Sequence, residues 1–166
     1  SGKHLTTIYI SHGDPDYYFG LETLTQAFPD AKVLASGPTV EHINKTKDAK
    51  LAFWGPQMGK DVPGKLIVPQ VLKGNTLSLE GHELDIVGLG GRQPDRTFVW
   101  IPSLKAVVGG VVVADNLHVW MADTQTPQSH KHWLATLKRI DSLQPQVVVP
   151  GHYLGENDRS LNAVHF

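Results

Sequence analysis

The sequence predicts an α/β protein with more than one sheet. Strand and helix patterns alternate twice, several short strands separated by turn residues follow, and a helix and one more strand complete the chain. Alternating strands and helices are typical of layered α/β proteins, and successive short strands are typical of an antiparallel meander. A length of 166 residues suits one domain with a substantial core, so we expect residues 1–166 to form a single domain.

The first third of the chain carries the alternating pattern. Residues 4–10 are rich in β-branched and aromatic side chains and predict a strand. Leu21, Leu24 and Phe28 recur at helical spacing, so a helix is expected there. Residues 31–35 are apolar over a short run and predict a second, buried strand.

A second helix is expected to open at Pro38, because proline fits the first turn of a helix. The lysine-rich residues 45–50 indicate a solvated helix face. Residues 53–64 contain repeated glycine and proline and predict an ordered loop. The aromatic and methionine side chains of this loop either close over the core or wall a substrate pocket.

The remaining chain predicts the meander and then an α-β pair. Thr126 and Pro127 form a good helix start, and we expect this helix to end before Pro145. Residues 146–149 then predict another buried strand. The short strands of the meander are expected at 66–68, 76–79, 84–89, 97–101, 106–108 and 111–113.

Composition excludes several function classes. The formal net charge is −1, which gives no electrostatic footprint for nucleic acid or an anionic membrane surface. There is no cysteine, so disulfides and thiolate chemistry are absent. No signal-peptide pattern and no apolar run of membrane-spanning length is seen, so we expect a soluble protein, cytoplasmic by default.

The loop after the first predicted strand carries the strongest chemical signal. His12, Asp14 and Asp16 stand at alternating positions directly after the apolar run of residues 8–10. A strand that ends in imidazole and carboxylate groups is a common way to build a metal site. The alternative is that the aspartates and Gly13 only form a turn and that His12 ends the strand.

A second strand also delivers a histidine to a loop that contains glycine. Val147, Val148 and Val149 lead directly into Pro150-Gly151-His152. Together with the strand 111–113 that leads to Asp115, this gives three ordered segments that end in possible metal ligands.

These three segments resemble the metallo-β-lactamase superfamily of hydrolases. Residues 8–20 stand where that family has a strand followed by T-H-x-H-x-D-H-x-x-G, and residues 111–115 stand at its strand ending in Gly-Asp. Residues 147–152 match the strand-P-G-H segment of the family. The resemblance implies a four-layer αβ/βα sandwich with a metal site at one edge. The chain begins a few residues before the first motif, so we expect an N-terminally shortened version of this fold.

The resemblance also implies the site residues. His12 takes the first histidine of the motif, Asp115 the aspartate that bridges two metals, and His152 the last histidine. Asp16 takes the motif aspartate and is a candidate for both metal binding and catalysis. The full set of implied ligands is His12, Asp14, Asp16, Asp115 and His152.

Three departures from the family pattern change the expected chemistry. Asp14 stands in place of the second histidine, and Tyr17 in place of the histidine that follows the aspartate. Residues 89–93 lack the histidine of the Gly-His-Thr stretch. Two imidazoles and three carboxylates suit harder ions at least as well as zinc. We expect one divalent metal, zinc, manganese or iron. Tyr17 would be a weak ligand, a hydrogen-bond donor to an oxyanion, or a packing residue.

Two functions follow from this reading. The first is hydrolysis of an ester, lactone or amide of small molecules by a metal-bound water, with Asp16 and Tyr17 as catalytic residues. The second is a non-catalytic protein that binds a small ligand or a partner on a decayed site. Because the family usually carries more strands before the first motif, an exposed sheet edge and therefore a homodimer are expected.

Other polar residues are open candidates. His118 lies three residues after Asp115 and could replace a lost ligand, or lie packed or exposed. His82 is expected in a surface turn, and Arg92 either binds an anionic substrate group or forms a surface salt bridge. His130 and His132 are expected to be solvated on the late helix.

Overall fold

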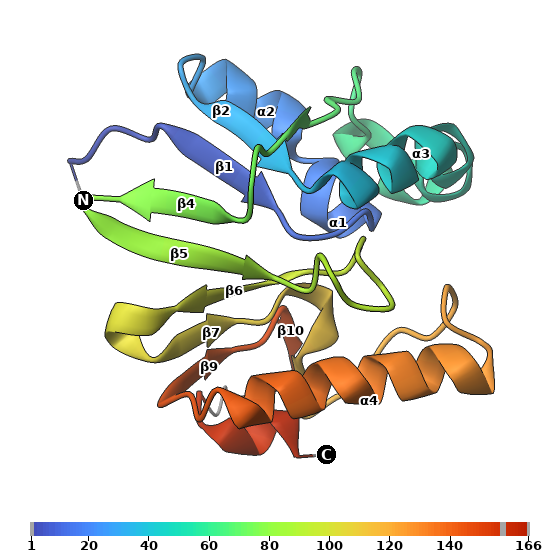
Figure 1. Ribbon diagram of the computed structural model, residues 1–166. Coiled ribbons are helices and arrows are strands. Elements are labelled where there is room, and N and C mark those ends of the chain that lie inside the picture. Colours follow the sequence, from blue (N-terminus) through green and yellow to red (C-terminus); the bar gives the residue numbers. More distant parts are fainter. Residues whose placement is uncertain (1, 157–158, 166) are drawn as a thin grey trace. The chain divides into compact units, whose positions relative to one another are not determined.

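The structure is a computed structural model that describes residues 2–156 and 159–165. The chain divides into two compact units, Ser1–Lys73 and Gly74–Phe166, which we name unit 1 and unit 2 and describe separately (Figure 1). The mixture of helices and several sheets confirms the predicted α/β class.

Unit 1 is a three-stranded parallel sheet with helices. Strand β1 pairs with β2 from Thr7–Lys32 to Ile10–Ala35, and β2 pairs with the short β3 (Figure 1). The predicted strands at 4–10 and 31–35 and the helix at Leu21 are confirmed, whereas the predicted strand 66–68 is wrong. Its side chains pack against the core without strand pairing. The elements are β1 (Thr7–Ile10), α1 (Pro15–Tyr18), α2 (Leu21–Ala27), β2 (Lys32–Ala35), α3 (Gly37–Met58), a 3₁₀ helix (Gly59–Asp61) and β3 (Gln70–Val71).

Helix α3 is longer than the sequence predicts. Ser36 caps it, because its Oγ accepts a hydrogen bond from the Thr39 amide at 3.1 Å, and Pro38 lies in the first turn. The expected loop at 53–64 is wrong for its first half, since the helix continues through Met58 although Pro56 lies inside it. Leu51, Trp54 and Met58 follow helical spacing and pack against the unit 1 core, which favours the helix over a loop.

Unit 2 contains the meander. Strands β4 to β7 pair antiparallel in sequence order, as predicted, and β9 adds in parallel to β7 (Figure 1). A second, two-stranded sheet joins β8 and β10 in parallel. The elements are β4 (Thr76–Leu79), β5 (His82–Val87), β6 (Phe98–Ile101), a 3₁₀ helix (Pro102–Leu104), β7 (Ala106–Val108), a 3₁₀ helix (Gly110–Val112), β8 (Ala114–Asp115), α4 (Pro127–Ser142), β9 (Val147–Val149), β10 (His152–Tyr153) and a 3₁₀ helix (Leu161–Val164).

The predicted strand at 111–113 is wrong. Gly110 has φ 52°, a left-handed value, and begins a 3₁₀ helix, Gly110–Val112, that includes the first two of the three valines. All three valines are buried, so their apolar run reflects burial rather than an extended backbone. The strand begins only at Ala114, immediately before Asp115.

Helix α4 begins and ends as predicted. Thr126 and Ser129 form a capping box, in which each side chain accepts a hydrogen bond from the other residue's backbone amide. Trp133 and Ile140 are buried on one face, and the Trp133 indole N–H donates to the Val112 carbonyl at 2.9 Å. This hydrogen bond ties α4 to the segment that leads into β8.

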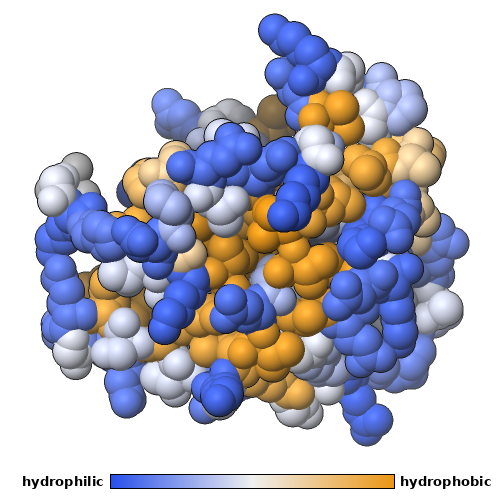
Figure 2. Space-filling model, turned by 90° about the horizontal axis from the view of Figure 1, so that it is seen from above, coloured by the Kyte–Doolittle hydropathy of each residue, from blue (hydrophilic) through white to orange (hydrophobic). Residues whose placement is uncertain are grey.

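Large apolar side chains also reach the surface. Figure 2 shows hydrophobic surface interrupted by hydrophilic side chains on the face seen from above. Within the described parts of the chain, no helix has both the length and the apolar content that crossing a membrane requires. The large exposed apolar residues of unit 1 are Leu24, Phe28, Phe53, Val62 and Val71.

The close packing of the His12 loop on α3 predicts the effect of a substitution at Gly13. A Cβ at this position would lie 2.7 Å from His42 Cδ2 and 3.3 Å from Ile43 Cγ1, so these side chains, α3 or the loop must shift. We expect Gly13→Ala to destabilise the protein by about 1–3 kcal/mol in chemical denaturation. Gly20→Ala is the control, because no atom lies within 4 Å of a Cβ built there. Equal stability of the two variants would contradict this packing.

The burial of α4 makes a second prediction. Ile140 has no exposed surface, whereas Leu134 on the same helix is 53% exposed. We expect Ile140→Ala to lower the unfolding free energy by about 2–5 kcal/mol through loss of buried contacts and a cavity. Leu134→Ala should change it by less than about 0.5 kcal/mol. The measurement is urea denaturation of both variants. A comparable loss of unfolding free energy in the two would show that Ile140 does not lie on the buried face of α4.

Candidate functional site

In unit 1 the candidate residues follow the end of β1. Strand β1 ends at Ile10, and the next turn buries His12 at 1% and Asp14 at 8% exposure. A buried carboxylate is costly unless charged or hydrogen-bonding partners surround it. The arrangement around Asp14 therefore decides what this loop can do.

Both carboxylate oxygens of Asp14 have close partners. Oδ1 accepts a hydrogen bond from Lys50 Nζ at 2.9 Å, and Oδ2 lies 3.0 Å from His12 Nε2. Burial by itself raises the pKa of the Asp14 carboxyl, but the contacts with His12 and Lys50 outweigh burial and hold that pKa well below its usual range. Asp14 is therefore a carboxylate at neutral pH, and its charge is shared with two neighbours.

Lys50 is a site residue that the sequence does not reveal. The prediction that residues 45–50 form a solvated face is wrong for Lys50, whose side chain is only 15% exposed. Its ammonium also donates to the Gly13 carbonyl at 3.0 Å and lies 3.4 Å from His42 Nε2. Lys50 and His42 both come from α3, so this helix supplies the cation that meets the loop.

The His12 ring is oriented from both sides. Its Nδ1 accepts a hydrogen bond from the Asp14 amide at 3.3 Å, so in the neutral ring the proton lies on Nε2, which is 3.0 Å from Asp14 Oδ2. The Tyr17 ring meets it edge-on, with 5.2 Å between ring centroids. A metal bound at Nε2 requires that nitrogen to be free of its proton, and hence a change from this arrangement.

Asp16 and Tyr17 lie in the short helix α1. Asp16 is exposed, in the first turn. Burial raises the pKa of the Tyr17 phenol far above its usual value, and the charges of Asp16 and Asp14 raise it further. Tyr17 is thus a proton donor in hydrogen bonds at neutral pH rather than a base.

Unit 2 brings Asp115 and His152 onto neighbouring strands. In the parallel pairing of β8 with β10, Ala114 is opposite His152 and Asp115 is opposite Tyr153. The backbone holds both ends of this pair, since Gly151 N–H donates to Val113 O at 3.0 Å and Leu154 N–H to Asp115 O at 3.1 Å. Asp115 is 3% exposed and His152 is half-buried. A carboxylate residue and an imidazole residue far apart in sequence thus lie on neighbouring strands, one register position apart.

The other polar candidates lie at the surface. His118, His82, Arg92 and His130 are exposed, and His118 Nδ1 is 2.7 Å from the Val119 carbonyl. Sequence reasoning missed Arg96, which is 5% exposed and has its guanidinium carbon 5.1 Å from the centroid of the Trp133 ring. No local pattern distinguishes this arginine, because its stacking partner lies on α4.

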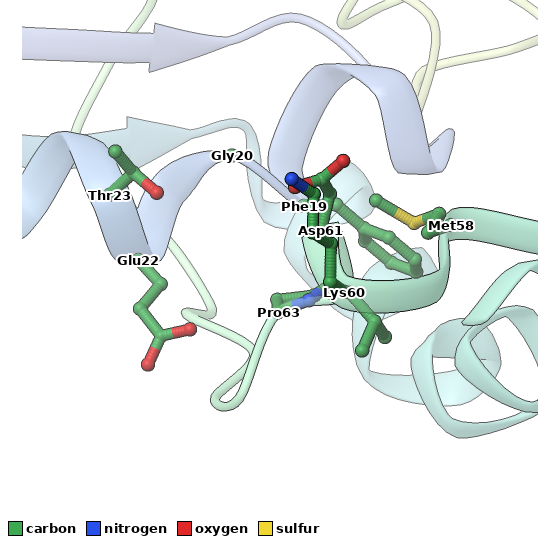
Figure 3. A pocket seen from close by; sticks show the side chains of 9 residues that line it. Phe19, Gly20, Glu22, Thr23, Met58, Lys60, Asp61 and Pro63 are labelled. Carbon is green, nitrogen blue, oxygen red and sulfur yellow. The ribbon is translucent and has the colours of Figure 1, made fainter. Parts of the chain in front are cut away.

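A pocket of about 340 Å³ lies in unit 1, and none of the predicted metal-binding or catalytic residues lines it (Figure 3). The Phe19 ring and Met58 lie close together in this view, while Glu22 projects from α2. Glu22 Oε2 accepts hydrogen bonds from the Gly64 and Lys65 amides at 2.8 and 3.1 Å, so its carboxylate fixes the adjacent loop. Part of the segment 53–64 thus walls a pocket, but without a candidate catalytic group. The lining residues are Phe19, Gly20, Glu22, Thr23, Met58, Lys60, Asp61, Val62 and Pro63.

The donor sets can be tested against a divalent metal. Among residues 2–156 and 159–165, neither unit gathers three histidine, aspartate or glutamate side chains into a metal-binding group. Asp115 and His152, a buried carboxylate and an imidazole on neighbouring strands, are donor types that bind a divalent metal. Asp14 fits poorly, because an ammonium and an imidazole already face its two oxygens.

Solved structures share this fold at low sequence identity. A metallo-beta-lactamase from Pontibacter korlensis is 18% identical with a TM-score of 0.62, over 96% of this chain and 66% of its own. A beta-lactamase domain protein from Burkholderia ambifaria is 13% identical with a TM-score of 0.69, over 99% and 52%. A chemotaxis sensor described as a peroxy diiron species is 18% identical with a TM-score of 0.54, over 96% and 68%.

The chain spans about half to two thirds of the length of these structures. No curated protein matches it. The family model described as the metallo-beta-lactamase superfamily matches residues 1–152, which is most of the sequence. The fold class and the resemblance of the three motifs are thereby confirmed: the chain belongs to the metallo-beta-lactamase superfamily.

Proposed function

We propose that the protein is a metal-dependent hydrolase that uses one divalent ion. The observation that carries this proposal is that the parallel pairing of β8 and β10 brings Asp115 and His152 onto neighbouring strands of unit 2. Asp115 is nearly inaccessible to solvent, and a buried carboxylate is stabilised by a cation. Superfamily membership supports the hydrolase class.

The chain's own residues would have distinct roles. Asp115 and His152 would hold the ion, and the family resemblance adds His12 and Asp16 as further candidates. A bound zinc, manganese or iron ion supplies an activated water and polarises a carbonyl. Because its pKa is raised, the Tyr17 phenol stays protonated and can donate a hydrogen bond to a developing oxyanion. The substrate class would be an ester, a lactone or an amide.

One observation favours a second function, binding of a small ligand without catalysis. The ammonium of Lys50 already neutralises Asp14 in the loop where the family carries histidines. A loop held by an internal ion pair keeps its conformation without a metal. The fold would then present a binding surface in place of a reaction centre.

Removal of the unit 2 ligands distinguishes these functions. We expect protein purified without chelator to contain about one equivalent of a divalent transition metal. His152→Ala and Asp115→Asn should each lose the metal and lower kcat/KM for an aryl ester or a lactone by about 100-fold or more. The measurements are elemental analysis and steady-state hydrolysis.

His130→Ala is the matched control, since His130 is an exposed histidine of the same unit. It should keep both the metal and the activity of the unaltered protein. Failure to bind manganese, iron or zinc, together with no turnover of ester, lactone or anilide, would reject the hydrolase and leave the ligand-binding function.

A further inference from the structure

Polar groups of unit 1 surround the Lys50 ammonium. An ammonium group has three N–H donors. Near Nζ lie Asp14 Oδ1 at 2.9 Å, the Gly13 carbonyl at 3.0 Å and His42 Nε2 at 3.4 Å. The side chain is 15% exposed, so solvent contributes little to its partners. This is a defined site for one cation, and the protein's own lysine fills it.

The packing around this cation also depends on Gly13 and His42. The His12 loop lies against α3 so closely that a Cβ at Gly13 would be 2.7 Å from the His42 ring. This close approach brings the Gly13 carbonyl and the Asp14 carboxylate to Lys50, which lies 36 residues after Asp14 in the chain. Lys45 on the same helix pairs with Glu41 in solvent at 2.6 Å, which shows what an ordinary surface lysine of α3 does.

A lysine and a divalent ion cannot both use the Asp14 carboxylate at low cost. Oδ1 faces the ammonium and Oδ2 faces His12, so a metal at either oxygen would displace one of these groups. If Lys50 stayed, two cations would lie a few ångströms apart in a largely buried site and repel each other. The choice between the two cations is therefore exclusive.

We propose that Lys50 is the resident cation of the His12 loop, so that Asp14 is the counter-ion of this lysine and is not a metal ligand. The inference rests on the proposed function for the metal that the other candidate residues would hold. Lys50 is a positioning residue: it acts through Asp14 and Gly13, and it fixes the loop whether or not a metal is present.

The experiment measures metal content and thermal unfolding of the full chain in four variants, made from three substitutions. Asp14→Asn should keep the metal stoichiometry of the unaltered protein, with a Kd for Mn²⁺ or Zn²⁺ within about twofold. Lys50→Met should lower Tm by about 5–10 °C, because it leaves a buried carboxylate without its cation. The double variant should recover part of that loss, because the uncompensated charge is gone. Lys45→Met, the matched control, should shift Tm by about 1 °C or less.

Two results would overturn the inference. One is a loss of bound metal, or a rise in Kd of about tenfold or more, on Asp14→Asn, which would make Asp14 a ligand. The other is a Tm for Lys50→Met that matches the Lys45→Met control. If Lys50→Met does not fold, Asp14→Asn carries the test. If the unaltered protein binds no metal, the proposed function fails, while the Tm comparison still decides the role of Lys50.

Discussion

The conformation of unit 1 depends on how the protein accommodates the buried charge of Asp14. A carboxylate at 8% exposure needs partners that offset its lost hydration, and the sequence near the loop supplies only His12. The second partner, Lys50, must come from α3, which therefore has to begin and run at one defined place. The Ser36 cap fixes that start, and Gly13 allows the loop to approach the helix.

In unit 2, backbone pairing rather than an ion pair fixes the strands that carry Asp115 and His152. Two residues of β8 pair with two residues of β10, and amide hydrogen bonds from Gly151 and Leu154 lie on both sides of this pairing. Such a short sheet gains stability from the segment around it, including the Trp133 hydrogen bond to Val112 just before β8. The Trp133 hydrogen bond thus links the position of β8, and with it Asp115, to the packing of α4.

Features of the fold that depend on residues close together in the chain could be predicted from the sequence. The turn after β1, the start of α4 at Thr126 and the strand before His152 each depend on neighbouring residues, and each lies where the pattern indicates. The role of Lys50 could not be predicted, because a lysine within a lysine-rich helix segment is usually solvated and its partner is 36 residues away. Helix α3 is also longer than the pattern indicates, because tertiary packing of Trp54 and Met58 outweighs the glycine and proline nearby. Arg96 was missed for the same reason, since its aromatic partner is on another element.

Charge balance connects Lys50 to the loop that holds Asp14. Within unit 1, Asp14 is buried whereas Asp16 is exposed, so Asp14 is the carboxylate that has lost most of its hydration. Lys50 offsets this charge from α3, at the position where the family resemblance implies a histidine instead of Asp14. Because an ammonium already offsets the Asp14 charge, a metal ion would gain little at this carboxylate. Asp14 and Lys50 therefore depend on each other, since removal of either one leaves the other as a largely buried charge without its counter-ion.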